Sequence, residues 1–162
     1  TQPCSSAASD VYKRQGLYRG QALTARLEGT RDKMDRAAQE ELDHLSWCNK
    51  RLDELNERPS FLSPLWYGLS FGMGAIAGAA GDKWSLGFVH ETEHQVVIHL
   101  EDHLNKLSPS DAKTIAILEQ MKLDEANHSE EALSSGAEIL PDGIKSLMSV
   151  IAKVMTKTSY YI

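Results

Sequence analysis

Cysteine is scarce in this chain of 162 residues, which contains only Cys4 and Cys48. Two thiols cannot build a disulfide framework or a Cys-x-x-Cys metal module, so the sequence fits a reducing compartment. Runs of Lys or Arg are also absent, and the net charge is −6. An acidic chain without basic clusters lacks the electrostatic footprint of nucleic-acid binding, and we expect no nucleic-acid partner.

Alternating strand patterns of useful length are missing too, and the apolar residues recur instead at helical spacing. We predict an all-α protein whose size allows one domain. Gly29 is expected to cap the first helix and Ser108 to cap the fourth. The predicted helices run over about Leu17 to Glu28, Arg31 to Glu57, Lys83 to Leu107, Ser108 to Ala137 and Ile144 to Tyr160.

A Glu-x-x-His spelling occurs twice, as Glu41 with His44 and as Glu125 with His128. Residues three apart lie on one face of a helix, so each pair can offer a carboxylate and an imidazole to one ion. One copy would be weak evidence, because surface helices produce it by chance. Two copies predict a two-metal carboxylate site in a helical bundle.

Carboxylates also stand at core positions of three predicted helices. Glu41, Glu93 and Glu125 each take the place of an apolar residue in a buried stripe. An unpaired buried carboxylate is costly, and a pair of divalent ions would resolve that cost. Glu91 lies off the stripe and is the fallback for Glu93. The alternative is that the helix phases are slightly shifted and these side chains face solvent.

The order of these residues suggests two related halves. Glu93 precedes Glu125 on the preceding helix, and the same spacing before Glu41 falls near position 9. Asp10 is the acidic residue there, so Asp10 is the candidate for a fourth helix's contribution.

Several motifs resemble the demethoxyubiquinol hydroxylases of ubiquinone biosynthesis, a family of ferritin-like di-iron monooxygenases. The resemblance covers about Gly16 to the C-terminus and rests on the segments 17–21, 39–44, 58–60, 70–75, 91–93 and 124–128. It implies a ferritin-like four-helix bundle with an additional Gly-rich apolar segment and a C-terminal helix. It also implies hydroxylation of a demethoxyubiquinol ring with O2, two iron ions per chain, and NADH as the ultimate reductant.

Carried over by this resemblance, the metal ligands are Glu41, His44, Glu93, Glu125 and His128, with Glu41 and Glu125 as bridging carboxylates. Glu40 and Asp124 each precede a ligand and are candidate partners for the imidazole N–H groups of the facing helix, or else ordinary surface charges. His99 matches a family histidine near the site, although a solvated or interhelical polar role fits it equally well.

The first helix departs from the family. Its expected Glu ligand falls on Val11, and residues 1–15 replace an acidic stretch with a Ser- and Ala-rich one. We hypothesise that residues 1–15 are foreign to the gene and that residues 16–162 form a single ferritin-like di-iron domain truncated at its N-terminus. If the segment is native, Asp10 could substitute for the missing ligand or the chain could be inactive.

The segment from Phe61 to Gly81 carries no charged residue and is rich in glycine. Pro64 and the glycines make it a poor spanning helix, so we predict a membrane-interface segment, with a buried hairpin as the alternative. The resemblance implies a polyprenyl quinol substrate and peripheral attachment at the cytoplasmic face of the cell membrane. A homo-oligomer or other ubiquinone-biosynthesis proteins are the expected partners.

Two other functions share the ligand pattern. One is a ferritin- or rubrerythrin-type oxidoreductase acting on iron or peroxide, which the uncharged Gly-rich block and the missing Cys-x-x-Cys module disfavour. The other is an inactive, metal-free scaffold, which the altered first helix makes plausible.

Overall fold

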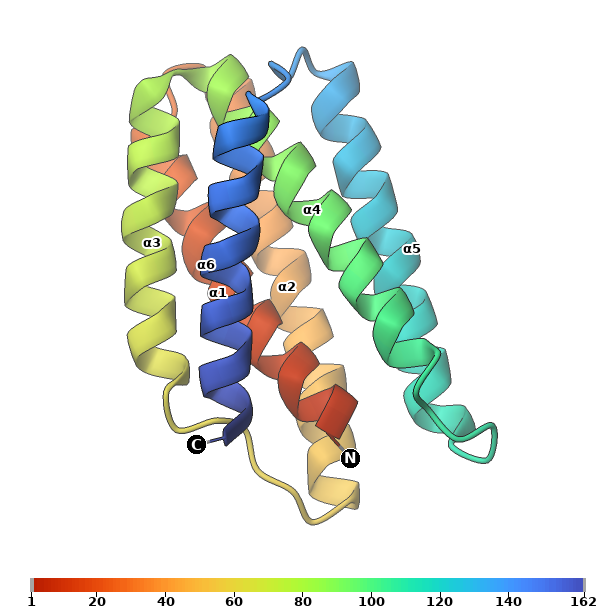
Figure 1. Ribbon diagram of the computed structural model, residues 1–162. Helices are drawn as coiled ribbons and strands as arrows, with labels where there is room; N and C mark the ends of the chain where they lie inside the picture. The colour runs from red at the N-terminus through yellow and green to blue at the C-terminus, as the bar shows by residue number, and fades with distance from the viewer. Residues whose placement is uncertain (1, 162) are drawn as a thin grey trace.

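The computed structural model describes residues 2–161, with side chains described for residues 4–158. Within that range all regular structure is helical, which confirms the all-α prediction (Figure 1). The helices are α1 (Gln2–Thr24), α2 (Glu28–Glu54), α3 (Ser63–Ala80), α4 (Asp82–Leu104), α5 (Ala112–Ser134) and α6 (Asp142–Tyr161).

Four long helices, α1, α2, α4 and α5, form a bundle of the ferritin-like kind. Helix α3 packs along α1 on the outside of this bundle, and α6 lies over α1 and α4 (Figure 1). The buried stripes follow the predicted phases: α2 buries Met34, Ala38, Cys48 and Leu52, and α5 buries Leu118 and Met121.

Close approach of α1 and α3 depends on glycine. A Cβ atom on Gly74 would lie 2.0 Å from the carbonyl oxygen of Leu17, and one on Gly20 would lie 2.1 Å from that of Phe71. Backbone atoms cannot yield to such contacts, so only glycine fits at these crossings.

The Gly-rich apolar segment folds as the single helix α3, so the hairpin alternative is wrong. Several of its large apolar side chains are exposed, among them Leu65, Leu69 and Ile76. Within the part of the chain that the structure describes, no helix combines the length and the hydropathy of a bilayer-spanning segment.

Several helix boundaries differ from the prediction. Helix α1 is continuous through position 15 and ends at Thr24, so the predicted boundary between 1–15 and 16–162 lies inside it. Gly29 belongs to the first turn of α2 and does not cap α1. The turn between these helices is stabilised by Asp82, whose carboxylate accepts hydrogen bonds from the backbone N–H groups of Arg26 (3.0 Å) and Leu27 (2.7 Å).

The start of α5 was also predicted too early. Asp111, not Ser108, is the N-cap, and its carboxylate accepts a hydrogen bond from the Thr114 N–H at 3.1 Å. Arg51 of α2 donates to the same carboxylate at 2.8 Å, a tertiary contact that fixes Asp111 as the cap.

Candidate metal centre

Ligand-type side chains from α2, α4 and α5 meet in the bundle interior as two groups of three. One group is Glu41, His44 and Glu125, and the other is Glu93, Glu125 and His128. Within each group the ligand atoms lie within 4.8 Å of one another. Glu125 belongs to both groups, so the arrangement offers two adjoining positions for a metal ion.

Helical spacing brings His128 to Glu125, and the packing of α2 on α5 brings His44 to the same carboxylate. The Nδ1 atom of His44 lies 3.2 Å from one carboxylate oxygen of Glu125, and Nδ1 of His128 lies 3.2 Å from the other. Each imidazole therefore flanks a different oxygen of the same carboxylate, as a bridging carboxylate between two ions requires.

The outer nitrogen of each imidazole is held by a carboxylate of the facing helix. His44 Nε2 lies 3.1 Å from Asp124 Oδ2, and His128 Nε2 is hydrogen-bonded to Glu40. An Nε2–H donated outward leaves the Nδ1 lone pair directed at the centre. The sequence predicted these contacts for Glu40 and Asp124, and their role beside a metal stays a prediction.

Glu93 tests whether the site suits a cation. Its side chain is fully buried, and neither carboxylate oxygen has a hydrogen-bond partner among the described residues. Burial, together with the nearby Glu125 carboxylate, raises the pKa of Glu93 well above its usual range. A buried carboxylate without a hydrogen-bond donor is typical of a metal ligand whose ion is not bound. The ligand atoms of this site therefore fit a divalent metal ion.

Sequence reasoning missed the cation that the structure places in this site. Arg14 of α1 donates from Nε and Nη2 to the two oxygens of Glu41 at 2.7 and 2.9 Å. Its Nη2 also donates to Glu125 at 2.6 Å. The side chain is 4% exposed, so these are buried, charge-assisted bonds.

A signal for Arg14 was present in the sequence. Cys4, Val11, Tyr18 and Gln21 are all buried at helical spacing along α1, and Arg14 falls on the same stripe. The predicted first helix begins at Leu17, so it does not include the part of this buried stripe that contains Arg14. An arginine at a core position should be expected to meet buried carboxylates.

Asp10 does not join either ligand group. Its carboxylate instead pairs with Lys13 at 2.9 Å, with Thr156 at 3.1 Å and with His99 at 3.4 Å. Asp10 therefore does not substitute for a carboxylate ligand in this structure. His99 likewise belongs to this polar contact, at the wall of the cavity described below, and outside both ligand groups.

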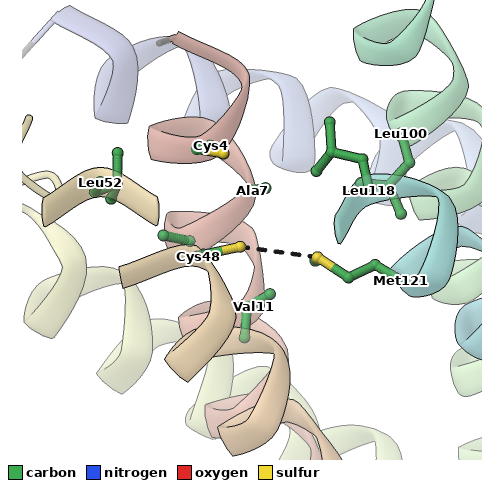
Figure 2. Close-up of a cluster of buried hydrophobic side chains, with 9 residues drawn as sticks. Cys4, Ala7, Val11, Cys48, Leu52, Leu100, Leu118 and Met121 are labelled. Atoms are coloured by element: carbon green, nitrogen blue, oxygen red, sulfur yellow. Dashed lines mark hydrogen bonds between the residues drawn. The ribbon is translucent and has the colours of Figure 1, made fainter. Parts of the chain in front are cut away.

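Val11, where the family's carboxylate was expected, lies in an apolar cluster (Figure 2). Cys48 and Met121, whose sulfur atoms lie 3.8 Å apart, are in the same cluster. Cys48 lies one helical turn after His44, and Met121 lies one turn before Glu125, so this apolar cluster borders the ligand groups.

Glu91, the fallback for Glu93, points elsewhere. Gln95 donates to its carboxylate at 2.7 Å, and Lys145 of α6 lies 3.9 Å from it. The structure thus brings Glu93, and not Glu91, to the other ligand-type residues.

The two histidines respond to the carboxylates around them. Burial opposes a charged imidazole, but hydrogen bonding with Glu125 and Glu41 outweighs it and raises the pKa of His44 to about 10. Burial also opposes the charged form of His128, but the Glu125 and Glu93 carboxylates outweigh burial and raise the pKa of His128 to about 9. Without a metal the site is therefore held together by protons and by Arg14.

An apolar cavity of about 740 Å³ adjoins the site between α1, α3, α4 and α6. Arg14 lines it at the ligand end. The rest of its wall is mainly apolar and includes Phe88, Ile98, Leu147 and Ile151. The cavity is large enough for a small-molecule ligand with an apolar body.

The family model of the ubiquinone biosynthesis protein COQ7 matches residues 12–159 of this chain. The chain belongs to this family. Relatives named 3-demethoxyubiquinol 3-hydroxylase include that of Acinetobacter baumannii, 58% identical over 91% of this chain and 70% of its own length. Those of Nitrosococcus oceani and Pseudomonas putida are 59% and 54% identical, each over 91% of this chain and 69% of their own length.

Membership of the COQ7 family agrees with the resemblance read from the motifs. It separates this chain from ferritin- and rubrerythrin-type proteins, which share the ligand pattern alone. All five ligand-type residues lie within the matched range, as does Arg14.

Proposed function

We propose that this chain is a monooxygenase that hydroxylates the ring of a demethoxyubiquinol with O2 at a di-iron centre. The observation that carries the proposal is the pair of ligand groups sharing a buried Glu125 beside a large apolar cavity. The names of the relatives support the choice of substrate. The iron ligands would be Glu41, His44, Glu93, Glu125 and His128.

When bound, the iron pair would supply the electron-transfer chemistry needed to reduce O2. The protein's own side chains would position it. Asp124 and Glu40 would keep the Nδ1 atoms of His44 and His128 facing the centre. One oxygen atom would enter a ring C–H bond and the other would leave as water, with reducing equivalents ultimately from NADH.

The cavity would bind the quinol. Its apolar walls on α3, α4 and α6 suit an isoprenoid tail, which gains free energy only away from water. The ring would then lie at the end lined by Arg14, within reach of the Glu41 and Glu125 carboxylates.

A membrane surface would supply such a substrate. Helices α3 and α6 both line the cavity, and both expose large apolar residues, including Leu69 and Ile76 on α3 and Val150 and Val154 on α6 (Figure 1). These faces would rest on the bilayer as a peripheral attachment. Flotation with phospholipid vesicles tests this: Ile76→Glu with Val150→Glu should reduce co-flotation, and unchanged flotation would reject these faces.

Complementation tests the activity. A strain lacking its demethoxyubiquinol hydroxylase would receive this chain or its Val11→Glu variant, and quinone lipids would be followed by mass spectrometry. Conversion of the demethoxyquinone by either chain, abolished by Glu125→Gln, supports the proposal. Expression of both folded chains without any conversion would reject it.

A further inference from the structure

Arg14 occupies the same carboxylate oxygens that a metal would use in one of the two ligand groups. It binds both oxygens of Glu41 and the Oε1 atom of Glu125, the oxygen that His44 faces. The group of Glu41, His44 and Glu125 is therefore filled by a guanidinium.

The second group is left open. The other oxygen of Glu125 faces His128, and both oxygens of Glu93 lack a hydrogen-bond partner among the described residues. Arg14 makes no hydrogen bond to Glu93 or His128 among those that the structure records. One complete set of ligand atoms thus stays available beside the filled one.

Electrostatic repulsion points the same way. The Arg14 guanidinium already lies against the oxygens of Glu41 and Glu125 that an ion in this group would bind. Two cations on the same buried oxygens would repel each other strongly, so an ion can enter this group only after displacing the guanidinium.

We propose that Arg14 is a built-in occupant of the Glu41–His44–Glu125 group, so that this chain binds one divalent metal ion tightly, at Glu93, Glu125 and His128. The inference rests on the proposed function of this site as a metal centre. Arg14 also lines the apolar cavity, which gives the side chain space to withdraw when a second ion binds.

Titration of the metal-free chain with Co2+ tests the proposal, with stoichiometry measured by visible absorption and by metal analysis. We expect one tightly bound Co2+ per wild-type chain and two per Arg14→Gln chain. The second ion should bind about tenfold or more tightly in the variant than in the wild type. Arg19→Gln is the matched control, because Arg19 lies on the same helix and pairs with Asp35 at the surface.

Two histidine variants locate the single ion. In the wild-type background, His128→Gln should abolish tight Co2+ binding, whereas His44→Gln should retain it. If Arg14→Gln does not fold without metal, two equivalents of Co2+ should restore its helical circular dichroism, and failure to do so would overturn the proposal.

The outcomes separate this inference from the proposed function. Equal stoichiometry of two in wild type and Arg14→Gln would overturn the role of Arg14 and leave the metal centre standing. Absence of binding in both folded chains would overturn the metal centre and the role of Arg14 together.

Discussion

The two halves of the bundle place different ionisable groups in one buried site, a carboxyl group from one half and a guanidinium from the other. Helix α4 contributes Glu93, a carboxylate with no donor among the described residues, and the equivalent helix α1 contributes the guanidinium of Arg14. The other two helices, α2 and α5, each contribute a Glu-x-x-His pair to the site. The difference teaches that the α4 side is arranged to receive a cation, while the α1 side already supplies one.

Removal of the Glu125 carboxylate should have the largest effect, because groups from both halves of the bundle contact it. Glu125→Leu leaves Arg14, His44 and His128 without a shared partner in the interior. We expect a loss of about 3–5 kcal/mol in the free energy of unfolding of the metal-free chain, measured by urea denaturation. Glu119→Leu, at an exposed position of α5, is the control. A loss no larger than the control's would contradict the central place of Glu125.

The position of α1 can be disturbed without touching the site. Gly74→Ala places a Cβ atom against the Leu17 carbonyl and should push α1 from α3. We expect about 1–3 kcal/mol of destabilisation in the same denaturation experiment. Gly68→Ala meets nothing within 4 Å and should leave that crossing intact. Equal effects of the two substitutions would show that the close crossing does not constrain α1.

Substitution of Glu93 should stabilise the metal-free chain, in contrast to substitution of Glu125. Glu93→Met removes a buried carboxyl without a donor and should stabilise the metal-free chain by about 1–2 kcal/mol. The same variant should bind Co2+ far more weakly, so stability and metal binding would move in opposite directions. Denaturation with and without Co2+ measures both, with Glu101→Met on the exposed face of α4 as control. Destabilisation by Glu93→Met in the absence of metal would contradict this account.

A dependence on pH follows from the two imidazoles of the site. The pKa of His44 is raised to about 10 and that of His128 to about 9, so their charged forms stabilise the folded, metal-free chain. This stability is fully present below the unfolded pKa of about 6.5 and is lost as pH rises through 9 to 10. Each imidazole contributes a slope of up to about 1.4 kcal/mol per pH unit. The raised pKa of Glu93 acts in the same direction above about pH 4.5.

Denaturation midpoints between pH 6 and pH 10 measure this loss. His128→Gln should show a shallower decline than the wild type. A metal-free wild-type chain whose stability is constant or rises over this range would contradict the predicted contribution of the imidazoles.

Much of the site could be read from the sequence because its residues follow helical periodicity. Glu41, Glu93 and Glu125 were placed in the core by their spacing, and all three are fully buried. The preference for Glu93 over Glu91 followed from the same stripe, and the structure brings Glu93 to the ligand groups.

What the sequence could not give depends on contacts between distant segments. Asp82 holds the turn before α2, and Arg51 holds the cap of α5, so neither helix begins where local signals suggested. The role of Arg14 does not follow from the predicted helices, because the hypothesis that residues 1–15 are foreign to the gene places them outside the first predicted helix. That origin stays a prediction, which resequencing of the locus tests; the family match begins at residue 12.

The apolar cluster beside the ligand groups contains a thiol whose labelling can report local opening of the bundle. Cys48 is fully buried, and burial raises the pKa of its thiol to about 12, so almost no reactive thiolate exists at neutral pH. A thiol reagent can modify Cys48 only when the helices around it separate. The rate at which Cys48 is labelled therefore reports how often the helices separate at this position, which is one helical turn from His44. A ligand that binds at the centre and holds the helices together should lower this rate.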